Sequence, residues 1–592
     1  MSMASAERSG PDLSHYPGGE ALYRLRHSAA HVLATAVTEL FPEVKVAGGP
    51  PIDTGFYYDF ARQQPFTPDD LARIEARMRE IIAANQPFEY SESSRAEAEK
   101  RYRAAGEKYK LHFLSQIPAD GKITFYRNGP FTDLCRGPHV ASTGEIKAFK
   151  LTHVAGAYWL GNEHNEMLQR IYGTAFPAQA ELDAFLKQIE EALKRDHRKL
   201  GRELDIFSIH DEVGPGLIHW HPRGGMLRHL IEQFWKDEHI RRGYHLVYTP
   251  HVASEKLYEI SGHLQNYADL MYAPMDIDGQ PYRVKPMNCP NHVMIYTSRK
   301  RSYRELPLRL AEFGTVYRYE RSGVLHGMDR VRGFTVDDSH IFCTRDQLAA
   351  EVEGVLDLMD YILRAFRYDY RCYLATRPKD KFLGSEEEWA FATAALRQAL
   401  ERRQLPYEID EGGGAFYAPK IDVKLKDALG REWQCPTIQV DLNLPKRFGV
   451  FYTGPDGQDH EVIMLHRALY GSLERFVGIF IEHTGGEFPV WVAPLQALVV
   501  PVNAKALDYA NATVASLKAA GVRADVDLRD EKLGAKIRDG ELAKIPYMLV
   551  VGPRDAEAGT VSVRRKGEGD LGAMPLAAFL DRIGREIREK TR

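Results

Sequence analysis

The spacing of apolar and polar positions predicts two amphipathic helices near the start of the chain. Over 22–41 apolar residues recur at helical intervals, and His27 and His31, four residues apart, share one face of that helix. A second helical pattern covers 68–86 and carries charges of both signs on its outer face. We assign 20–175 to one mixed α+β domain.

A long helical pattern with a polar face follows over 178–205 and contains no glycine before Gly201. We expect it to form a connecting helix, within a linker over 176–205. From 206 to 490 strand and helix patterns alternate with turn signals such as the Asp-Gly pair at 278–279. This alternation predicts one large α+β domain.

Glycine and proline residues at 485–494 indicate the next domain boundary. Beyond it, apolar strand patterns at 495–502, 547–551 and 560–565 alternate with helical stretches. That order is typical of a small α/β domain with a mostly parallel sheet, which we assign to 491–592. The fold class is therefore multidomain α+β.

Composition narrows the class of protein further. A length of 592 residues fits several domains, and the net charge of -4 excludes a generally cationic nucleic-acid coat but not a local basic surface. Five scattered cysteines argue against a disulfide framework and for a reducing, cytoplasmic location. No apolar run reaches about 18 residues, so no membrane span is expected. Residues 1–19 lack the apolar core of a signal peptide and are predicted to be a disordered leader.

The segment 317–343 combines the residue types that bind a nucleotide and a small acid. Its arginines surround three glycines, Phe334 and the adjacent pair Asp337 and Asp338. Arginine binds phosphate oxygens in a bidentate manner, and an aromatic ring can stack on a purine. The two aspartates could bind magnesium or a substrate hydroxyl or amine. The alternative is a solvated charged hairpin.

Three motifs in order resemble those of class II aminoacyl-tRNA synthetases. A long helical pattern over 227–243 leads to a strand pattern that ends on Pro250, like the first motif of that family. Segment 317–343 resembles the second motif, and Gly-Ser-Leu-Glu-Arg-Phe at 471–476 resembles the third. The resemblance implies a catalytic core built on an antiparallel sheet and a homodimer formed through the first motif.

The same resemblance implies roles in binding ATP together with Mg²⁺. Arg318 and Arg475 are the implied catalytic residues, and both would contact phosphates of the nucleotide. Glu320 would bind the adenine amino group, Arg330 the distal phosphates, and Phe334 would stack on the base.

Within the class, the chain resembles the threonyl-tRNA synthetase family at three possible zinc ligands. Cys289, His340 and His466 match that family's metal positions, although their spacing alone would not have grouped them. One thiolate and two imidazoles leave a fourth coordination position open for substrate. The partners implied are zinc, ATP, L-threonine and threonine tRNA.

A metal that binds the substrate hydroxyl would explain how threonine is separated from its isostere valine. A site built to bind a hydroxyl rejects the analogue that lacks it by about four orders of magnitude. Asp338 would accept the hydrogen bond of that hydroxyl. Other matching pocket positions are Tyr417, Lys420 and Gln439 for threonine and Gln434 for ATP.

Serine keeps the hydroxyl and lacks one methyl group, which is worth only about 1–3 kcal/mol, so a second, hydrolytic site is expected. The N-terminal domain resembles the editing domain of the family. The implied editing residues are His27, His31, Lys110, Asp133, Cys135 and His139. Read from residue types alone, three histidines and a cysteine could equally bind zinc. We favour metal-free hydrolysis of mischarged seryl-tRNA.

The C-terminal domain resembles the anticodon-binding domain of several class II synthetases. Basic residues cluster there, and contacts to RNA phosphates favour such side chains. Lys544 and Arg564 are the residues that we expect to face the anticodon.

Two positions depart from the family pattern. Val336 stands where many relatives carry glutamine, so a contact to the adenylate or amino acid must be absent or come from another residue. Asn291 replaces a common glycine and could change the backbone near Cys289. A further small β-rich domain that begins many relatives is not seen in this sequence. The rival hypotheses are a proline or serine enzyme, a non-catalytic tRNA-binding paralogue and a free-standing editing hydrolase.

Overall fold

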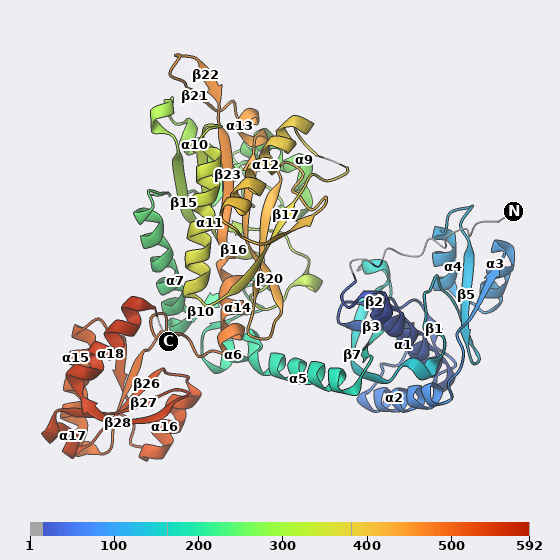
Figure 1. Cartoon of the computed structure of the whole chain (residues 1–592), viewed down its shortest axis with the longest axis horizontal. Helices are drawn as coiled ribbons and strands as arrows, with labels where there is room; N and C mark the ends of the chain where they lie inside the picture. Colours follow the sequence, from blue (N-terminus) through green and yellow to red (C-terminus); the bar gives the residue numbers. More distant parts are fainter. Residues whose placement is uncertain (1–12, 14–15, 163, 381, 591–592) are drawn as a thin grey trace. The chain divides into compact units, whose positions relative to one another are not determined.

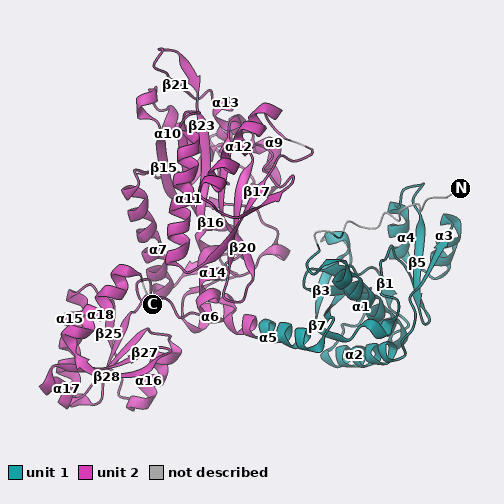
Figure 2. Cartoon of the chain, in the orientation of Figure 1, with its two compact units in different colours: residues 1–190 teal, residues 191–592 magenta. Residues whose placement is uncertain are grey.

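The computed structural model describes residues 13, 16–162, 164–380 and 382–590, so the predicted leader over 1–19 falls largely outside the described residues. The chain divides into two compact units, residues 1–190 and 191–592 (Figure 2). No helix among the described residues has the length and apolar character that crossing a membrane requires.

The first unit is built on a buried helix, as the periodicity of its sequence predicted. Helix α1 (Gly19–Leu40) buries most of its residues from Leu25 to Val37, against an expected span of 22–41. Helix α2 (Pro68–Ala83) begins at the side chain of Thr67, which accepts a hydrogen bond from the amide of Asp70 in a capping box. Both predicted helices are therefore confirmed.

Two antiparallel sheets complete the first unit (Figure 1). The larger has the order β1-β3-β8-β7, with β2 paired to β3, and the smaller has the order β4-β5-β6. Helices α3 (Arg95–Ala104) and α4 (Lys108–Gln116) lie between β4 and β5 in sequence. The strand bounds are Lys45–Val46 for β1, Pro51–Ile52 for β2, Gly55–Ala61 for β3, Glu89–Ser93 for β4, Ile123–Asn128 for β5, Phe131–Leu134 for β6, Ala148–Tyr158 for β7 and Met167–Phe176 for β8.

The prediction of a single connecting helix over 178–205 is wrong. The structure has two helices, α5 (Gln179–Arg195) and α6 (His197–Glu203), and the division between the units falls inside α5. Asp196 has non-helical backbone angles, and its carboxylate accepts a hydrogen bond from the amide of Arg198. Aspartate favours such a cap over a helix interior, which explains the break.

The second unit contains an eight-stranded sheet in the order β11-β15-β16-β23-β20-β19-β17-β18 (Figure 1). Every pairing from β15 to β17 is antiparallel, and only the two outermost pairings are parallel. The predicted antiparallel core is confirmed. The bounds are His245–Leu246 for β11, Leu308–Tyr317 for β15, Gly333–Cys343 for β16, Asp369–Ala375 for β17, Tyr407–Asp410 for β18, Lys420–Lys426 for β19, Glu432–Asp441 for β20 and Ile463–Ser472 for β23.

Four helices cover this sheet, and their apolar faces meet in the largest core of the chain. They are α7 (Pro222–Arg241), α11 (Leu348–Ala365), α12 (Glu386–Arg402) and α14 (Leu473–Thr484). Phe366, at the end of α11, has the rings of Phe476, Phe480 and Trp491 within about 5 Å.

The C-terminal sheet has the order β25-β24-β26-β27-β28, and only the pairings among β25, β24 and β26 are parallel. The prediction of a mostly parallel sheet is therefore wrong for its second half. The short links after β26 and β27 cannot make the crossover of a dozen or more residues that a parallel neighbour needs. The bounds are Ala497–Pro501 for β24, Ala524–Val526 for β25, Tyr547–Val551 for β26, Thr560–Arg565 for β27 and Gly569–Pro575 for β28. The helices are α15 (Leu507–Ala519), α16 (Leu533–Leu542), α17 (Pro553–Ala558) and α18 (Leu576–Glu589).

We expect Phe366→Ala to destabilise the second unit by about 3–5 kcal/mol, because it removes a fully buried ring from an aromatic cluster. Calorimetric unfolding of the full chain measures the change. Phe451→Ala is the matched control, since that ring is 45% exposed and its loss should shift the transition little. Equal effects of the two substitutions would contradict this assignment of the core.

Candidate active sites

Strand β16 separates the two adjacent aspartates onto opposite faces of the sheet. Successive side chains of a strand alternate, so Phe334, Val336, Asp338 and His340 share one face while Asp337 lies on the other. Asp337 is fully buried and accepts a hydrogen bond from the Trp235 indole at 2.9 Å. The two carboxylates therefore cannot bind one magnesium ion together.

One transverse row of the sheet brings together residues that are far apart in sequence. His340 on β16 lies directly opposite His466 on β23, which lies opposite Gln439 on β20, which lies opposite Lys420 on β19. Directly opposed residues have neighbouring side chains. Register thus places two predicted metal ligands beside two predicted threonine-pocket residues.

The third predicted ligand completes a buried group. Cys289, the first residue of α10 (Cys289–Thr297), contributes a sulfur that lies within 4.8 Å of a ring nitrogen of both His340 and His466. All three side chains are buried. A thiol and two imidazoles are the ligand types of a zinc site with one open position.

Hydrogen bonds from outside the group orient both imidazoles. Nε2 of His466 lies 3.0 Å from Asp441, so its other nitrogen is left for the centre. Nδ1 of His340 lies 2.8 Å from Nδ1 of His292, whose Nε2 lies 3.0 Å from Glu312. Because a carboxylate only accepts, His292 donates to Glu312 through Nε2, and the Nδ1 of a neutral His292 then accepts from His340.

This proton arrangement leaves Nε2 of His340 as a lone pair. That nitrogen is buried and has no hydrogen-bond partner, and burial holds the pKa of His340 well below its usual value. A neutral imidazole with its second nitrogen fixed is what metal ligation requires. The residues present therefore fit a zinc ion.

Asp338 and the pocket residues lie around this group. Oδ2 of Asp338 accepts a hydrogen bond from Asn288 at 3.0 Å, and Oδ1 lies 3.6 Å from Nε2 of His340. The hydroxyl of Tyr417 donates to Gln439 at 2.9 Å, and Lys420 pairs with Asp422 at 2.6 Å. A pocket beside the group is lined in part by Cys289, His466 and Tyr417.

A bulge in β20 turns Gln434 to the same face as Gln439. Thr437 pairs with Asp422 and Gln434 with Lys424, so β20 has one more residue than β19 between the two pairs. Since Asp422 and Lys424 share a face, Gln434 and Thr437 do so as well. The odd spacing of Gln434 and Gln439 had given no sign of this.

The residues predicted to bind ATP form three contacts around the second motif. The guanidinium of Arg318 lies 4.9 Å from the ring centre of Phe334, and its Nε donates to the carbonyl of Pro286 at 3.3 Å. Arg330 donates to Glu320 at 3.0 Å. Arg475 lies in the first turn of α14, and its buried Nε has no hydrogen-bond partner.

The two departures from the family pattern have different structural settings. Val336 lies between Phe334 and Asp338 on the shared face, opposite Gly314 and Ser472. Asn291 lies in the first turn of α10 and does not have a left-handed backbone.

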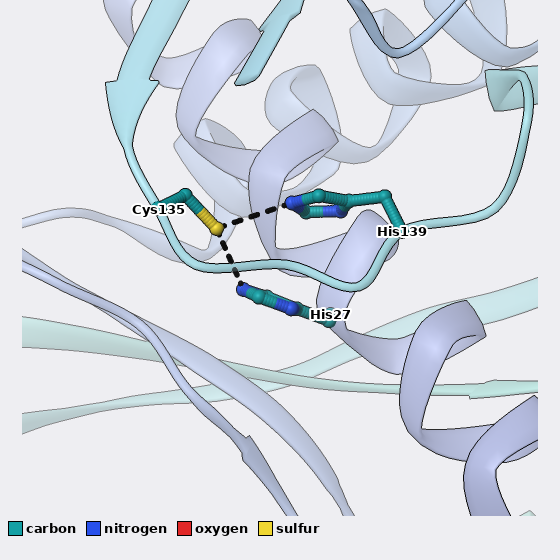
Figure 3. A group of neighbouring side chains, drawn as sticks. All are labelled: His27, Cys135 and His139. Atoms are coloured by element: carbon teal, nitrogen blue, oxygen red, sulfur yellow. Dashed lines mark hydrogen bonds between the residues drawn. The ribbon is translucent and has the colours of Figure 1, made fainter. Parts of the chain in front are cut away.

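In the first unit, Cys135 lies between two histidines. Its sulfur is 3.2 Å from Nε2 of both His27 and His139 (Figure 3). The two rings stack with centres 4.2 Å apart. His31 lies beside this group rather than in it, with a buried Nε2 that has no partner.

Hydrogen bonds fix the tautomers of both histidines. Nδ1 of His27 donates to the carbonyl of Pro138, at 3.2 Å. The hydroxyl of Ser28 donates its only proton to the carbonyl of Arg24, so it accepts from Nδ1 of His139 at 3.1 Å. Both Nε2 atoms therefore point lone pairs at Cys135. Burial raises the pKa of Cys135 to about 12, so it stays a neutral thiol.

Lys110 and Asp133 form a second buried group close to His31. Nζ of Lys110 lies 2.5 Å from Asp133 and donates to the hydroxyl of Tyr58 at 2.9 Å, and that hydroxyl donates to Asp133. Burial lowers the pKa of His31, and the charge of Asp133, the next largest influence, raises it. Five of the six predicted editing residues thus lie in two groups, and His31 lies beside both.

The comparisons with known proteins follow the same division of the chain. The family described as tRNA synthetase class II core domain (G, H, P, S and T) matches residues 272–484, and Anticodon binding domain matches 496–586. Threonyl and Alanyl tRNA synthetase second additional domain matches 123–172. A Threonine--tRNA ligase of Magnetococcus marinus is 52% identical over 572 residues, which cover 96% of this chain and 88% of the relative.

The chain belongs to the threonyl-tRNA synthetase family. A Threonine--tRNA ligase of Dehalococcoides mccartyi is also 52% identical, over 96% of this chain and 97% of the relative. A solved structure from Cryptosporidium parvum, titled as the RNA binding domain of threonyl-tRNA synthetase, superposes with a TM-score of 0.63 and 37% identity over 66% of this chain and 98% of that one. A prolyl-tRNA synthetase of the same organism shares the fold at 18% identity, with a TM-score of 0.52 over 66% of this chain and 75% of that one.

Basic residues of the C-terminal domain have separate surroundings. Arg564 on β27 lies 3.8 Å from Glu541 and 3.5 Å from Asp570, whereas Lys544 lies 3.6 Å from Glu487. The two residues predicted to face the anticodon therefore pair with different acidic side chains.

Several residues that orient the sites were missed from the sequence. They hydrogen-bond to the predicted residues directly or, for Glu312, through His292. His292 follows Cys289 by three residues on one helix, so helical spacing could have indicated it. The others gave no local signal, because folding alone brings them to the sites: Ser28, Tyr58, Asn288, Glu312 and Asp441.

The first unit should lose stability as pH falls from about 6.5 to 4. Burial lowers the pKa of both His27 and His31 to about 4, so in this window the unfolded chain binds protons that the folded chain does not. Each such histidine lowers the free energy of unfolding by about 1.4 kcal/mol for each pH unit below its unfolded pKa. Above that pKa the histidine causes no such loss. Hydrogen exchange of α1 amides measures it.

His31→Gln should reduce this acid sensitivity, and His164→Gln, at an exposed position of the same unit, should not. Equal exchange protection of α1 at pH 7 and pH 5 would contradict the buried neutral state of these histidines.

Proposed function

We propose that this chain is a threonine–tRNA ligase, which forms threonyl-adenylate from L-threonine and ATP and transfers threonine to its tRNA. The observation that supports this most is the row of β16, β23, β20 and β19. It presents two imidazoles and two amino-acid-pocket residues on the face that also carries Phe334.

The nucleotide binds, in this proposal, at the Phe334 end of β16. Arg318 contacts the α-phosphate, Phe334 stacks on adenine and Glu320 accepts from its amino group. Arg330, Gln434 and Arg475 complete the ATP site, and ATP enters with Mg²⁺. Glu320 and Arg330 pair with each other in the structure, so both must exchange that contact for the nucleotide.

Threonine binds at the His340 end of the same strand. Zinc, held by Cys289, His340 and His466, would supply a Lewis acid that binds the amine and β-hydroxyl of the substrate. Asp338 has one oxygen bonded to Asn288 and its other oxygen beside His340, where it can accept from the substrate hydroxyl. Tyr417, Lys420 and Gln439 position the rest of the amino acid.

The chemistry needs no protein nucleophile, because the threonine carboxylate attacks the α-phosphate, the α–β phosphoanhydride bond breaks and pyrophosphate leaves. The side chains orient the two substrates and neutralise phosphate charge, which are the dominant effects in such transfers. No observation favours a proline enzyme, which would have no use for three buried metal donors at this position.

We infer that the first unit hydrolyses seryl-tRNA without metal. Its Cys135, His27 and His139 could geometrically bind zinc, but no carboxylate orients these two histidines as Asp441 orients His466. The lone pairs of His27, His139 and His31 can instead accept from water and the terminal ribose. Lys110 and Asp133 provide a charged pair beside them.

We also propose a homodimer formed through α7 and the strand after it, in the cytoplasm. The exposed apolar side chains of Met226, Ile240 and Tyr248 support this surface.

The proposed domain boundaries are 20–175, 176–205, 206–490 and 491–592, and each family match lies inside one of them. Lys544 and Arg564 are proposed to contact the anticodon.

Purified protein should contain one zinc ion per chain, measured by elemental analysis. Cys289→Ser and His466→Asn should reduce this to near zero, and Asp441→Asn should weaken zinc affinity about 10–100-fold because it removes the negative charge of the group that orients His466. Cys435→Ser, at another buried cysteine of the same unit, should retain one zinc ion.

The zinc content of Cys135→Ser distinguishes a metal-free editing site from one that binds zinc. We expect it to keep one zinc ion per chain. A fall from two to one would show that the editing site binds metal.

His31→Ala and Cys135→Ala should slow the clearance of seryl-tRNA by at least ~100-fold, the usual contribution of a proton-transferring group. Formation of threonyl-tRNA should be unchanged, and His153→Ala, at an exposed position of the same unit, should clear seryl-tRNA normally. Normal clearance by both active-site variants would disprove the editing assignment.

A further inference from the structure

Strand β23, which leads into the helix that carries Arg475, does not pair regularly with β16. Val336 lies opposite Ser472 and Asp338 opposite Ala468, so β23 has four steps where β16 has two. Three residues of β23, 469–471, therefore face the single residue 337 of β16, and only Ser472 separates them from the start of α14 at Leu473. Buried backbone amides in such a bulge need other acceptors.

Asp337 supplies these acceptors from the face of the sheet opposite to the substrates. Its carboxylate accepts from the amides of Leu469 at 2.8 Å, Tyr470 at 2.9 Å and Gly471 at 2.9 Å. It also accepts from the indole of Trp235 on α7. Gly471 has φ +75° and faces the carbonyl of Cys435, so this turn needs both the glycine and the carboxylate.

Glu474 makes the reciprocal contact. It accepts from the amide of Thr335 on β16 at 2.8 Å, an amide next to the bulge. It also accepts from the hydroxyl of Ser472, whose oxygen in turn accepts from the amide of Arg475 at 3.2 Å. Arg228 of α7 lies 3.5 Å from Glu474.

Both carboxylates are thus bonded to the same helix. Arg228 and Trp235 are seven residues apart, two helical turns, and so lie on one face of α7. Asp337 and Glu474 are 0% and 3% exposed, and Asp337 lies on the face of β16 opposite to Phe334, Asp338 and His340. The nearest cation to Asp337 is Arg467 at 4.0 Å, which lies between the rings of Trp235 and Tyr244.

We propose that Asp337 and Glu474, the buried carboxylate pair, are positioning residues that fix Arg475 for nucleotide binding and connect it to α7. This rests on the proposed role of Arg475 in binding ATP. The pair replaces the missing ladder hydrogen bonds on both strands of the bulge, so it determines where β23 ends and α14 begins. Displacement of that turn would move Arg475 while leaving Asp338, His340 and His466 in regular register.

The test measures equilibrium binding of a non-hydrolysable ATP analogue to the full-length holoenzyme. Asp337→Asn puts an amide donor among four N–H donors and should weaken analogue binding about 10-fold or more. Zinc content and the affinity for threonine should change less than two-fold. Glu351→Gln, at a buried acid that pairs with Arg309 away from the bulge, should leave analogue binding unchanged.

A double-mutant cycle with Arg475→Ala shows whether the effect passes through that arginine. We expect Asp337→Asn to weaken binding less than two-fold in the Arg475→Ala background. Equal weakening in both backgrounds would overturn the proposal, as would a lowered unfolding temperature with unchanged analogue binding. If Arg475→Ala itself does not weaken binding, the proposed role of Arg475 fails, and the positioning role fails with it.

Trp235→Phe provides a milder variant, because it removes only the donor from α7 and keeps an aromatic ring. We expect it to weaken analogue binding about 2–5-fold. Unchanged binding would overturn the connection to α7.

Discussion

The cross-strand register of the central antiparallel sheet is the constraint on which both proposed substrate sites depend. Side chains two residues apart share a face, and directly opposed residues on neighbouring strands are adjacent. These two rules place His340, His466, Gln439 and Lys420 in one row and put Phe334 at the other end of the same strand. A shift of one residue in β16 would turn Asp337 to the substrates and bury Asp338.

Two groups of cysteine and histidine in this chain differ in what surrounds them. Around Cys289, carboxylates orient both histidines. Asp441 orients His466 directly, and Glu312 orients His340 through His292. Around Cys135, the histidines donate to a carbonyl and a hydroxyl, which are neutral acceptors. Negative second partners make an imidazole a better metal ligand, so similar donors are expected to serve a metal in one unit and water or ribose in the other.

Much of the architecture follows from local sequence pattern. Helical periodicity gave α1 and α2 almost to their ends, and the motifs gave the antiparallel core. The break at Asp196 was missed because a helix-compatible pattern continues through it, and only the capping chemistry of aspartate signals it. The strands of the C-terminal sheet follow from their apolar patterns. Their antiparallel pairing follows from the short links after β26 and β27, which the strand patterns alone do not take into account.

The predicted site residues came from family resemblance, because sequence spacing could not group Cys289 with His340 and His466. The residues that orient them could not be predicted, since folding brings them in from other elements. Asp337 shows this most clearly, because its sequence neighbours suggested a metal or substrate ligand while the alternation of β16 points it into the protein.

Pyrophosphate exchange into ATP, measured with threonine, serine, valine and proline in turn, tests the central claim most directly. A site that binds the β-hydroxyl next to the nucleotide predicts fast exchange with threonine, slower exchange with serine, and exchange with valine lower by about four orders of magnitude. Proline should give none. Exchange with proline or valine that equals or exceeds exchange with threonine would contradict the account.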